Sequence, residues 1–123
     1  MTLIGCFATP HPPIVVPEVG GGEVARVQST YDAMQALGRK AAALDPDTIV
    51  LLSPHTSLSR ERMGVSPAAH FYGSLAHFRA PQVQVELEGD LSLTQMIKAG
   101  ADQAGVPMGF TAQPGSSVDL DHG

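Results

Sequence analysis

Two histidines in this chain each follow a proline that ends an apolar, strand-like run of residues. The first run spans residues 3–9 and leads to His11, and the second spans residues 48–52 and leads to His55. Proline makes the α conformation unfavourable for the residue that precedes it, so each run is expected to end without starting a helix. Ligands of open α/β sheets bind outside the carboxyl ends of the strands. The sequence therefore predicts both imidazole rings just past one edge of a sheet.

The segment between the two runs predicts a helical crossover. Apolar positions recur every three or four residues from Glu23 to about Leu44, which is typical of an amphipathic helix. A strand, helix, strand order implies a right-handed connection and parallel strands. Residues 48–52 are apolar at consecutive positions, so this strand is expected to be buried on both faces.

The rest of the chain continues the alternation of strands and helices. Expected in order are a short strand at 63–66, a half-exposed edge strand at 82–88, a helix from Leu91 to about Ala104 capped by Asp90 and closed by Gly105, and a strand at 106–110. The predicted fold class is α/β, with a parallel or mixed sheet flanked by helices.

Composition narrows the function and the location. The 123 residues suffice for one domain, and 12 acidic against 7 basic residues, with no basic block, argue against a nucleic-acid partner. A single cysteine, Cys6, cannot form an intrachain disulfide, which fits a reducing cytoplasm. The N-terminus lacks a basic start before its apolar stretch, and no apolar run approaches 18 residues. We expect a cytoplasmic protein without a membrane partner.

The paired histidines allow two interpretations from the residues alone. Imidazole is a common metal ligand, and two imidazoles with one carboxylate form the facial triad of non-haem Fe(II) oxygenases. Alternatively, both are surface loop residues whose rings bond to nearby backbone. The 44 positions between His11 and His55 exceed the short ligand loops of zinc fingers, so only the fold could assemble a shared site.

Three ordered motifs carry a resemblance to a known family. They are TPHPPIVVPEVG at residues 9–20, PDTIVLLSPH at residues 46–55 and LDHG at residues 120–123. In order and spacing they resemble the class III extradiol ring-cleavage dioxygenase family, most closely the branch found with the AmmeMemoRadiSam system. On this resemblance, residues 1–123 are the N-terminal portion of one extradiol dioxygenase-like domain.

The resemblance implies a role for each histidine of the motifs. His11 and His55 match the two histidine ligands of non-haem Fe(II), and His122 matches a catalytic, substrate-binding histidine of the pocket. Members of the family use O2 to open a small aromatic, catechol-type substrate beside its hydroxyl groups. Their third ligand, a glutamate, and a further acid/base histidine lie beyond the LDHG motif, so the chain is expected to be truncated and to lack both.

Other interpretations stay open beside the dioxygenase. The same fold could serve as an inactive metal- or ligand-binding protein or as a structural fragment, and Zn2+ in a hydrolase would suit the same histidines because imidazole selects iron only weakly. Incomplete burial of apolar faces would favour a homo-oligomer. The remaining candidate side chains are expected to be solvated or ordinary loop residues: Glu18, His70, His77, Glu86 and Glu88.

Overall fold

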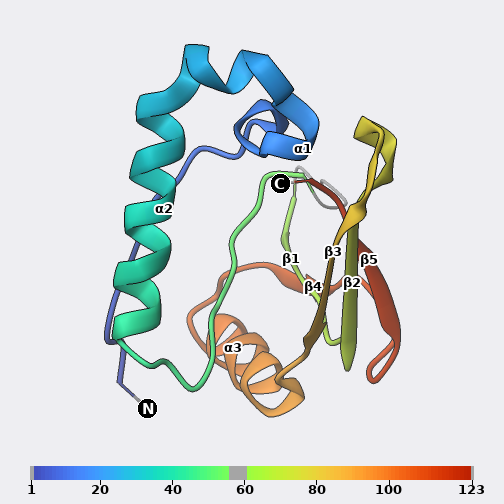
Figure 1. Ribbon diagram of the computed structural model, residues 1–123. Coiled ribbons are helices and arrows are strands. Elements are labelled where there is room, and N and C mark those ends of the chain that lie inside the picture. The colour runs from blue at the N-terminus through green and yellow to red at the C-terminus, as the bar shows by residue number, and fades with distance from the viewer. Residues whose placement is uncertain (1, 56–60, 123) are drawn as a thin grey trace.

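The computed structural model describes residues 2–55 and 61–122 and shows a mixed α/β protein (Figure 1). The helical segments are η1 (Pro13–Val15), α1 (Pro17–Gly20), η2 (Gly21–Val27), α2 (Gln28–Ala43), η3 (Ala76–Phe78) and α3 (Leu91–Gln103). The strands are β1 (Met63–Val65), β2 (His70–Leu75), β3 (Ala80–Glu88), β4 (Met108–Phe110) and β5 (Ser117–Leu120). The predicted fold class is confirmed.

The strands form two small sheets. In the larger one, β2 lies in the centre, pairs antiparallel with β3 and pairs parallel with β5. Tyr72 of β2 thus lies opposite Glu86 on one side and Asp119 on the other. The second sheet is the parallel pair β1 and β4. Because β5 returns to pair with β2, the chain that leaves β5 emerges at the same end of the sheet as η3 (Figure 1).

The sequence predicts the elements between β3 and β4 well. α3 begins after Asp90, whose carboxylate accepts a hydrogen bond from the backbone N–H of Leu93 at 2.8 Å, which is the N-cap arrangement. The helix is followed by Gly105 with φ of +69°, a left-handed conformation that glycine adopts without strain. β3 is an edge strand, as predicted, but Val85 and Leu87, which belong to the apolar face of its alternating pattern, are exposed and not buried.

The two apolar runs before the histidines are the main correction. Neither residues 3–9 nor residues 48–52 form a strand; both are extended, irregular chain (Figure 1). The expected burial on both faces is also wrong, because Ile49 is 72% exposed and Leu52 is 81% exposed. A strand forms only when its N–H and C=O groups bond to a neighbouring strand. Within the part of the chain that the structure describes, no ladder pairs with either run.

The packed centre of the protein is small. Among residues 2–55 and 61–122, the buried apolar side chains are Val15, Pro67, Ala68 and Ala80. The accessible surface is 9043 Å², whereas a compact monomer of 12.8 kDa exposes about 6,300 Å². Much apolar side-chain surface therefore stays in contact with solvent. None of the described helices combines the length and the apolar character needed to cross a membrane.

Candidate metal centre

His11 and His55 meet, as the sequence predicts. Their Nε2 atoms are 2.7 Å apart, and the rings stand edge to face at 88° with centroids 4.6 Å apart. The expected parallel strands do not bring them there. Two extended segments converge instead, and each turns at its histidine.

The local sequence explains why each segment turns at that point. After His11, Pro12 is held at φ −72° and Pro13 opens η1, where the N–H of Val15 donates to the carbonyl oxygen of Pro12 at 3.1 Å. Val15 is 6% exposed and anchors this turn. On the other segment, the N–H of His55 donates to the Ser53 hydroxyl oxygen at 3.2 Å, a bond that favours a turn.

The residues after β5 join this pair. The ring of His122 lies with its centroid 4.6 Å from that of His55 and 6.4 Å from that of His11. Asp121 adds a carboxylate: one oxygen of Asp121 and one ring nitrogen from each of His55 and His122 all lie within 4.8 Å of one another. His55 therefore belongs both to the pair with His11 and to the group with Asp121 and His122. We call His11, His55, Asp121 and His122 the histidine cluster.

The donor atoms of the histidine cluster fit a metal ion. Imidazole nitrogens bind transition metals at about 2.0–2.1 Å, which places two ligand atoms at right angles about 3.0 Å apart. The Nε2 atoms of His11 and His55, at 2.7 Å, need only a small opening to accept one ion between them. Nitrogen and carboxylate donors together suit iron, zinc and other divalent transition metals. His11 is half-buried and the other three members are exposed, so the site is open to solvent.

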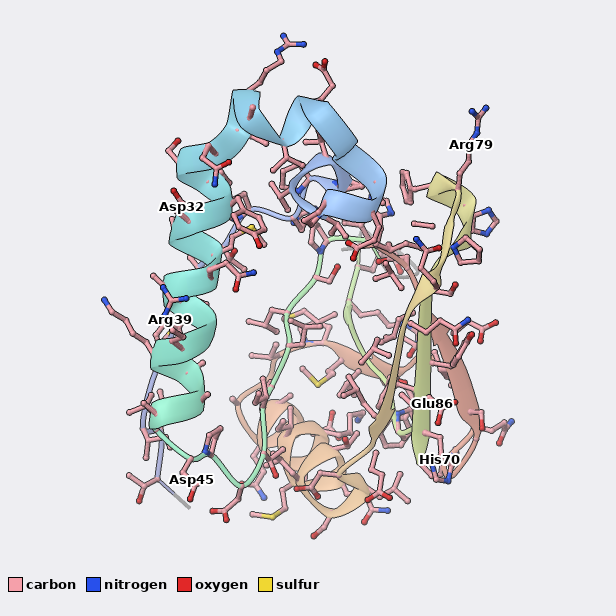
Figure 2. The ribbon with its side chains drawn as sticks, viewed as in Figure 1. Asp32, Arg39, Asp45, His70, Arg79 and Glu86 are labelled. Atoms are coloured by element: carbon pink, nitrogen blue, oxygen red, sulfur yellow. The ribbon has the colours of Figure 1, made fainter. Side chains whose placement is uncertain are left out.

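Phe78 borders the histidine cluster. Its ring contacts that of His122 with centroids 5.2 Å apart and an angle of 68°. Phe78 ends η3, the short turn that links β2 to β3, and Arg79 closes this turn in the left-handed conformation with φ of +62°. Figure 2 shows Arg79 at the tip of this hairpin, away from His70 and Glu86 at the other end of the sheet. The hairpin thus delivers an aromatic side chain to the cluster.

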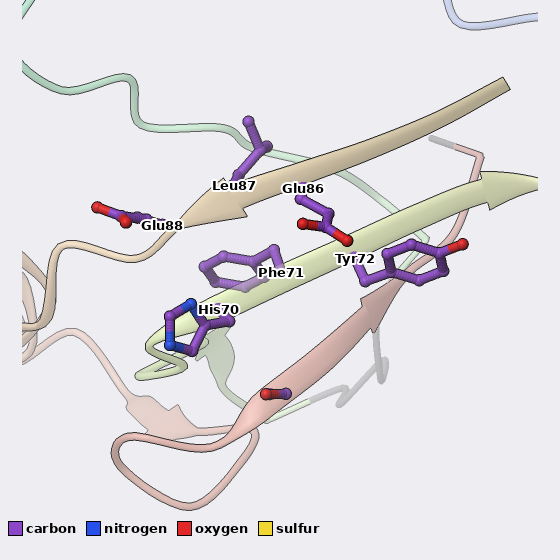
Figure 3. A pocket seen from close by; sticks show the side chains of 7 residues that line it. His70, Phe71, Tyr72, Glu86, Leu87 and Glu88 are labelled. Atoms are coloured by element: carbon purple, nitrogen blue, oxygen red, sulfur yellow. The ribbon is translucent and has the colours of Figure 1, made fainter.

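The other histidines and glutamates considered from the sequence lie outside the histidine cluster. His70 starts β2 opposite Glu88, and both line a shallow pocket of about 460 Å³ on the larger sheet (Figure 3). Glu86 lines the same pocket beside Tyr72. These three side chains, like Glu18 and His77, are exposed.

Sequence reasoning placed Asp121 in a segment typical of a site loop but gave it no role, and it missed Phe78 as a neighbour of the site. Asp121 had a signal, because a carboxylate directly precedes the motif histidine His122. Phe78 had no such signal, because the apolar residues of the segment 70–78 do not recur at a regular helix or strand spacing. Its place beside the cluster depends on the hairpin between β2 and β3.

Comparison with known proteins places the chain in a family. The model of the catalytic LigB subunit of aromatic ring-opening dioxygenase matches residues 5–123, a range that includes the whole histidine cluster. The chain belongs to this LigB family. Protein CA_C1420 of Clostridium acetobutylicum is 34% identical over 128 residues that cover 100% of this chain and 27% of that protein. The chain thus spans about a quarter of the length of this curated relative. No solved structure matches it.

Proposed function

We propose that this chain carries the metal-binding histidines of an extradiol-dioxygenase-like protein that uses Fe(II) and O2 to cleave catechol-type aromatic rings. The observation that carries the proposal is the 2.7 Å approach of His11 Nε2 to His55 Nε2, with the His122 ring against His55. Membership of the LigB family supports a dioxygenase-like fold around these residues. The activity and the substrate of the whole protein are part of the proposal.

The first task of the chain is to bind the ion. His11 and His55 would each present a neutral ring with an Nε2 lone pair, because a protonated imidazole cannot ligate. When bound, Fe(II) supplies adjacent open positions at which a catecholate and O2 can react. The half-buried turn around Val15 holds His11 in place, which keeps the two nitrogens convergent before the ion arrives.

The second task is to handle protons and to orient the substrate. His122 lies beside His55 but farther from His11, so in this proposal it remains off the metal and faces the bound aromatic ring. Its imidazole can accept a proton from a substrate hydroxyl and later return it, which is general acid–base catalysis. The Phe78 ring restricts the orientation of His122 and offers an apolar surface to an aromatic substrate.

A Zn2+-dependent hydrolase is the second candidate function. The observation that favours it is the set of two nitrogens and one carboxylate oxygen at His55, His122 and Asp121, which is also a donor set of catalytic zinc sites. Zinc has no redox chemistry, so this alternative predicts hydrolysis without oxygen uptake by the zinc-loaded protein. Two further parts of the first proposal concern where the protein works. The single cysteine supports a cytoplasmic location, and the motif resemblance supports an association with the AmmeMemoRadiSam system.

The test of the metal-binding role is an anaerobic Fe(II) titration by calorimetry. We expect His11→Ala and His55→Ala each to lower the affinity at least about 100-fold, since loss of even an outer partner of a ligand costs about 10- to 100-fold. His77→Ala is the matched control, because His77 is exposed and lies outside the histidine cluster. Equal metal uptake by the parent chain and both cluster variants would remove these residues from the site.

The test of the reaction is oxygen uptake with a panel of catechols by an iron-loaded version of the protein that extends past residue 123 to include the glutamate and the histidine that the resemblance implies. We expect His122→Ala to keep its iron content and to lose oxygen uptake, because a pocket histidine acts on the substrate without binding the metal. If iron and oxygen uptake are lost together, His122 is a ligand. If only the zinc-loaded protein turns over, on ester or amide substrates, the hydrolase is the correct function.

A further inference from the structure

We infer that the polar face of the larger sheet is a docking surface for an extended basic segment of a partner protein, which it binds through arginine side chains at alternate positions. His70 and Glu86 of this face lie at the end of the sheet away from Arg79 and the hairpin that borders the histidine cluster (Figure 2). The inference therefore needs no metal ion and goes beyond the proposed function.

Strand pairing arranges the side chains of this face in two similar rows. In the first row, Glu86 of β3 lies opposite Tyr72 of β2, and Tyr72 lies opposite Asp119 of β5. The second row has the same order two residues along the strands and consists of Glu88, His70 and Ser117. Residues two apart on a strand share a face, so both rows lie on one side of the sheet. Each row therefore has a carboxylate on β3, a planar ring on β2 and a side-chain oxygen on β5.

The charge of the two rows favours a cationic partner. Glu86, Glu88 and Asp119 are exposed, and within the part of the chain that the structure describes none of the three forms an ion pair or a side-chain hydrogen bond. The strands β2, β3 and β5 contain no lysine and no arginine. The negative charge of this face is therefore not balanced within the sheet, and a positively charged ligand would complement it.

The rings at the centre of the rows favour arginine over lysine. Tyr72 is 37% exposed, and Figure 3 shows the Glu86 side chain directed toward it. A guanidinium group can stack on an aromatic face and donate two parallel hydrogen bonds to a neighbouring carboxylate, whereas an ammonium group cannot make this paired contact. The pocket of about 460 Å³ that both rows line gives room for such side chains. Each row can thus take one arginine.

The distance between the rows favours an extended segment. Positions two apart on a strand are separated by about 6.6–6.8 Å, and this is also the spacing of alternate side chains in an extended peptide. A segment with arginine, any residue and arginine therefore places one guanidinium on each row. Two adjacent arginines would point to opposite sides of the segment, so only one of them could reach the face.

The experiment measures the binding of fluorescein-labelled peptides by fluorescence anisotropy in about 0.05 M salt, where surface charges are only partly screened. The probe peptide is GSRSRSG. The comparison peptides are GSSRRSG, which has the same composition with adjacent arginines, and GSKSKSG, which carries lysines. We expect the probe to bind at least about threefold more tightly than either comparison, a difference typical of one exposed charge pair or cation–ring contact.

Variants of the chain locate the binding to the two rows. We expect Glu86→Gln with Glu88→Gln to weaken the probe about 10-fold, because each removes one exposed charge pair. Tyr72→Leu should weaken it about two- to fivefold and Tyr72→Phe should not, since the ring and not the hydroxyl stacks on the guanidinium. Glu18→Gln is the matched control for the single charge changes, because Glu18 is exposed on α1 and lies outside both rows. We expect it to leave the affinity unchanged.

A second measurement uses the parent chain alone and so avoids any folding defect of a variant. The chain has two tyrosines, and we expect the ring resonances of Tyr72 to shift when the probe is added while those of Tyr31 on α2 stay in place. Unchanged Tyr72 resonances at saturating probe would overturn the inference. Equal binding of GSRSRSG and GSSRRSG would overturn the two-row arrangement, and equal binding of GSKSKSG would overturn the assignment to arginine.

Discussion

Residues 2–55 and 61–122 differ in how their predicted elements form. In the second region the predicted edge strand and helix appear as β3 and α3. In the first region the helix forms as α2, but both predicted strands stay extended and unpaired. A helix makes its hydrogen bonds within one segment, whereas a strand makes them to another. An apolar run therefore specifies a strand only where a partner strand is present.

The candidate site draws on both regions. His11 and His55 come from the first and reach each other without a sheet, through turns made by prolines and by Ser53. Asp121 and His122 come from the second, at the end of a paired strand. The geometry of the histidine cluster therefore depends on turns in one region and on strand pairing in the other.

The largest expected effect of this difference is on self-association. Unpaired apolar runs favour pairing with a second copy of the chain, and we expect the protein to associate at micromolar concentrations. Leu52→Lys places a charge in the run that is most exposed and should weaken association about 10-fold, because charged residues oppose edge pairing. Sedimentation velocity over a range of concentrations measures this effect.

Met96→Lys is the control for this prediction. Met96 is 58% exposed on α3, outside both apolar runs, and the substitution adds the same charge. We expect it to leave the association unchanged. An equal effect of the two substitutions, or a monomer at every concentration, would show that the runs do not drive association.

The same contrast shows how far the sequence predicts this structure. The approach of His11 and His55 follows from two proline-histidine turns and a helix between them, and these local signals survive even though the strands do not form. α3 follows from its apolar spacing and from Asp90. β5 has no comparable local signal, because its four residues are held by pairing with β2, which lies far away in the sequence. The place of Asp121 is hard to predict for the same reason.

Alanine substitutions at two helical glycines test whether residues 2–55 and residues 61–122 unfold together. Gly38 of α2 and Gly100 of α3 lie on their helices where a Cβ atom would meet no atom within 4 Å. Alanine at each should stabilise its helix by about 0.5–1 kcal/mol. We measure the urea concentration at which half of the β-sheet signal is lost. We expect Gly100→Ala to raise this concentration and Gly38→Ala to leave it unchanged. Equal shifts for the two variants would show that residues 2–55 and 61–122 unfold as one cooperative unit.

Gly89→Ala is a control of opposite sign. A Cβ atom there would lie 1.9 Å from the carbonyl oxygen of Ala68, a fully buried residue. The backbone must move to accept the methyl group, so the sheet signal should be lost at lower urea than in the parent chain. An unchanged midpoint would mean that this part of the sheet does not limit the stability of residues 61–122.

The smallest expected effect concerns a contact between the two regions. Asp90 accepts hydrogen bonds from the backbone N–H of Leu93 and from the hydroxyl of Thr48, at 2.8 and 3.0 Å. These bonds favour the charged carboxylate and lower the pKa of Asp90 below its usual value of 3.8, the Leu93 bond more than the Thr48 bond. Because the pKa is lower in the folded protein, the stabilisation is complete above about pH 4 and is lost as the pH falls through the folded pKa.

Thr48→Val tests the contribution of the first region to the lowered pKa of Asp90, which lies in the second region. The substitution removes the hydroxyl donor and leaves the Leu93 bond in place, so the pKa of Asp90 should rise toward 3.8 without reaching it. A 13C titration of the Asp90 carboxyl group measures this shift. Ser92→Ala is the comparison, because it changes a neighbouring polar side chain but keeps the backbone N–H groups that face Asp90. If Thr48→Val leaves the titration of Asp90 unchanged, residues 48–52 are not held against α3, and the first region is even more loosely attached than its exposed apolar run indicates.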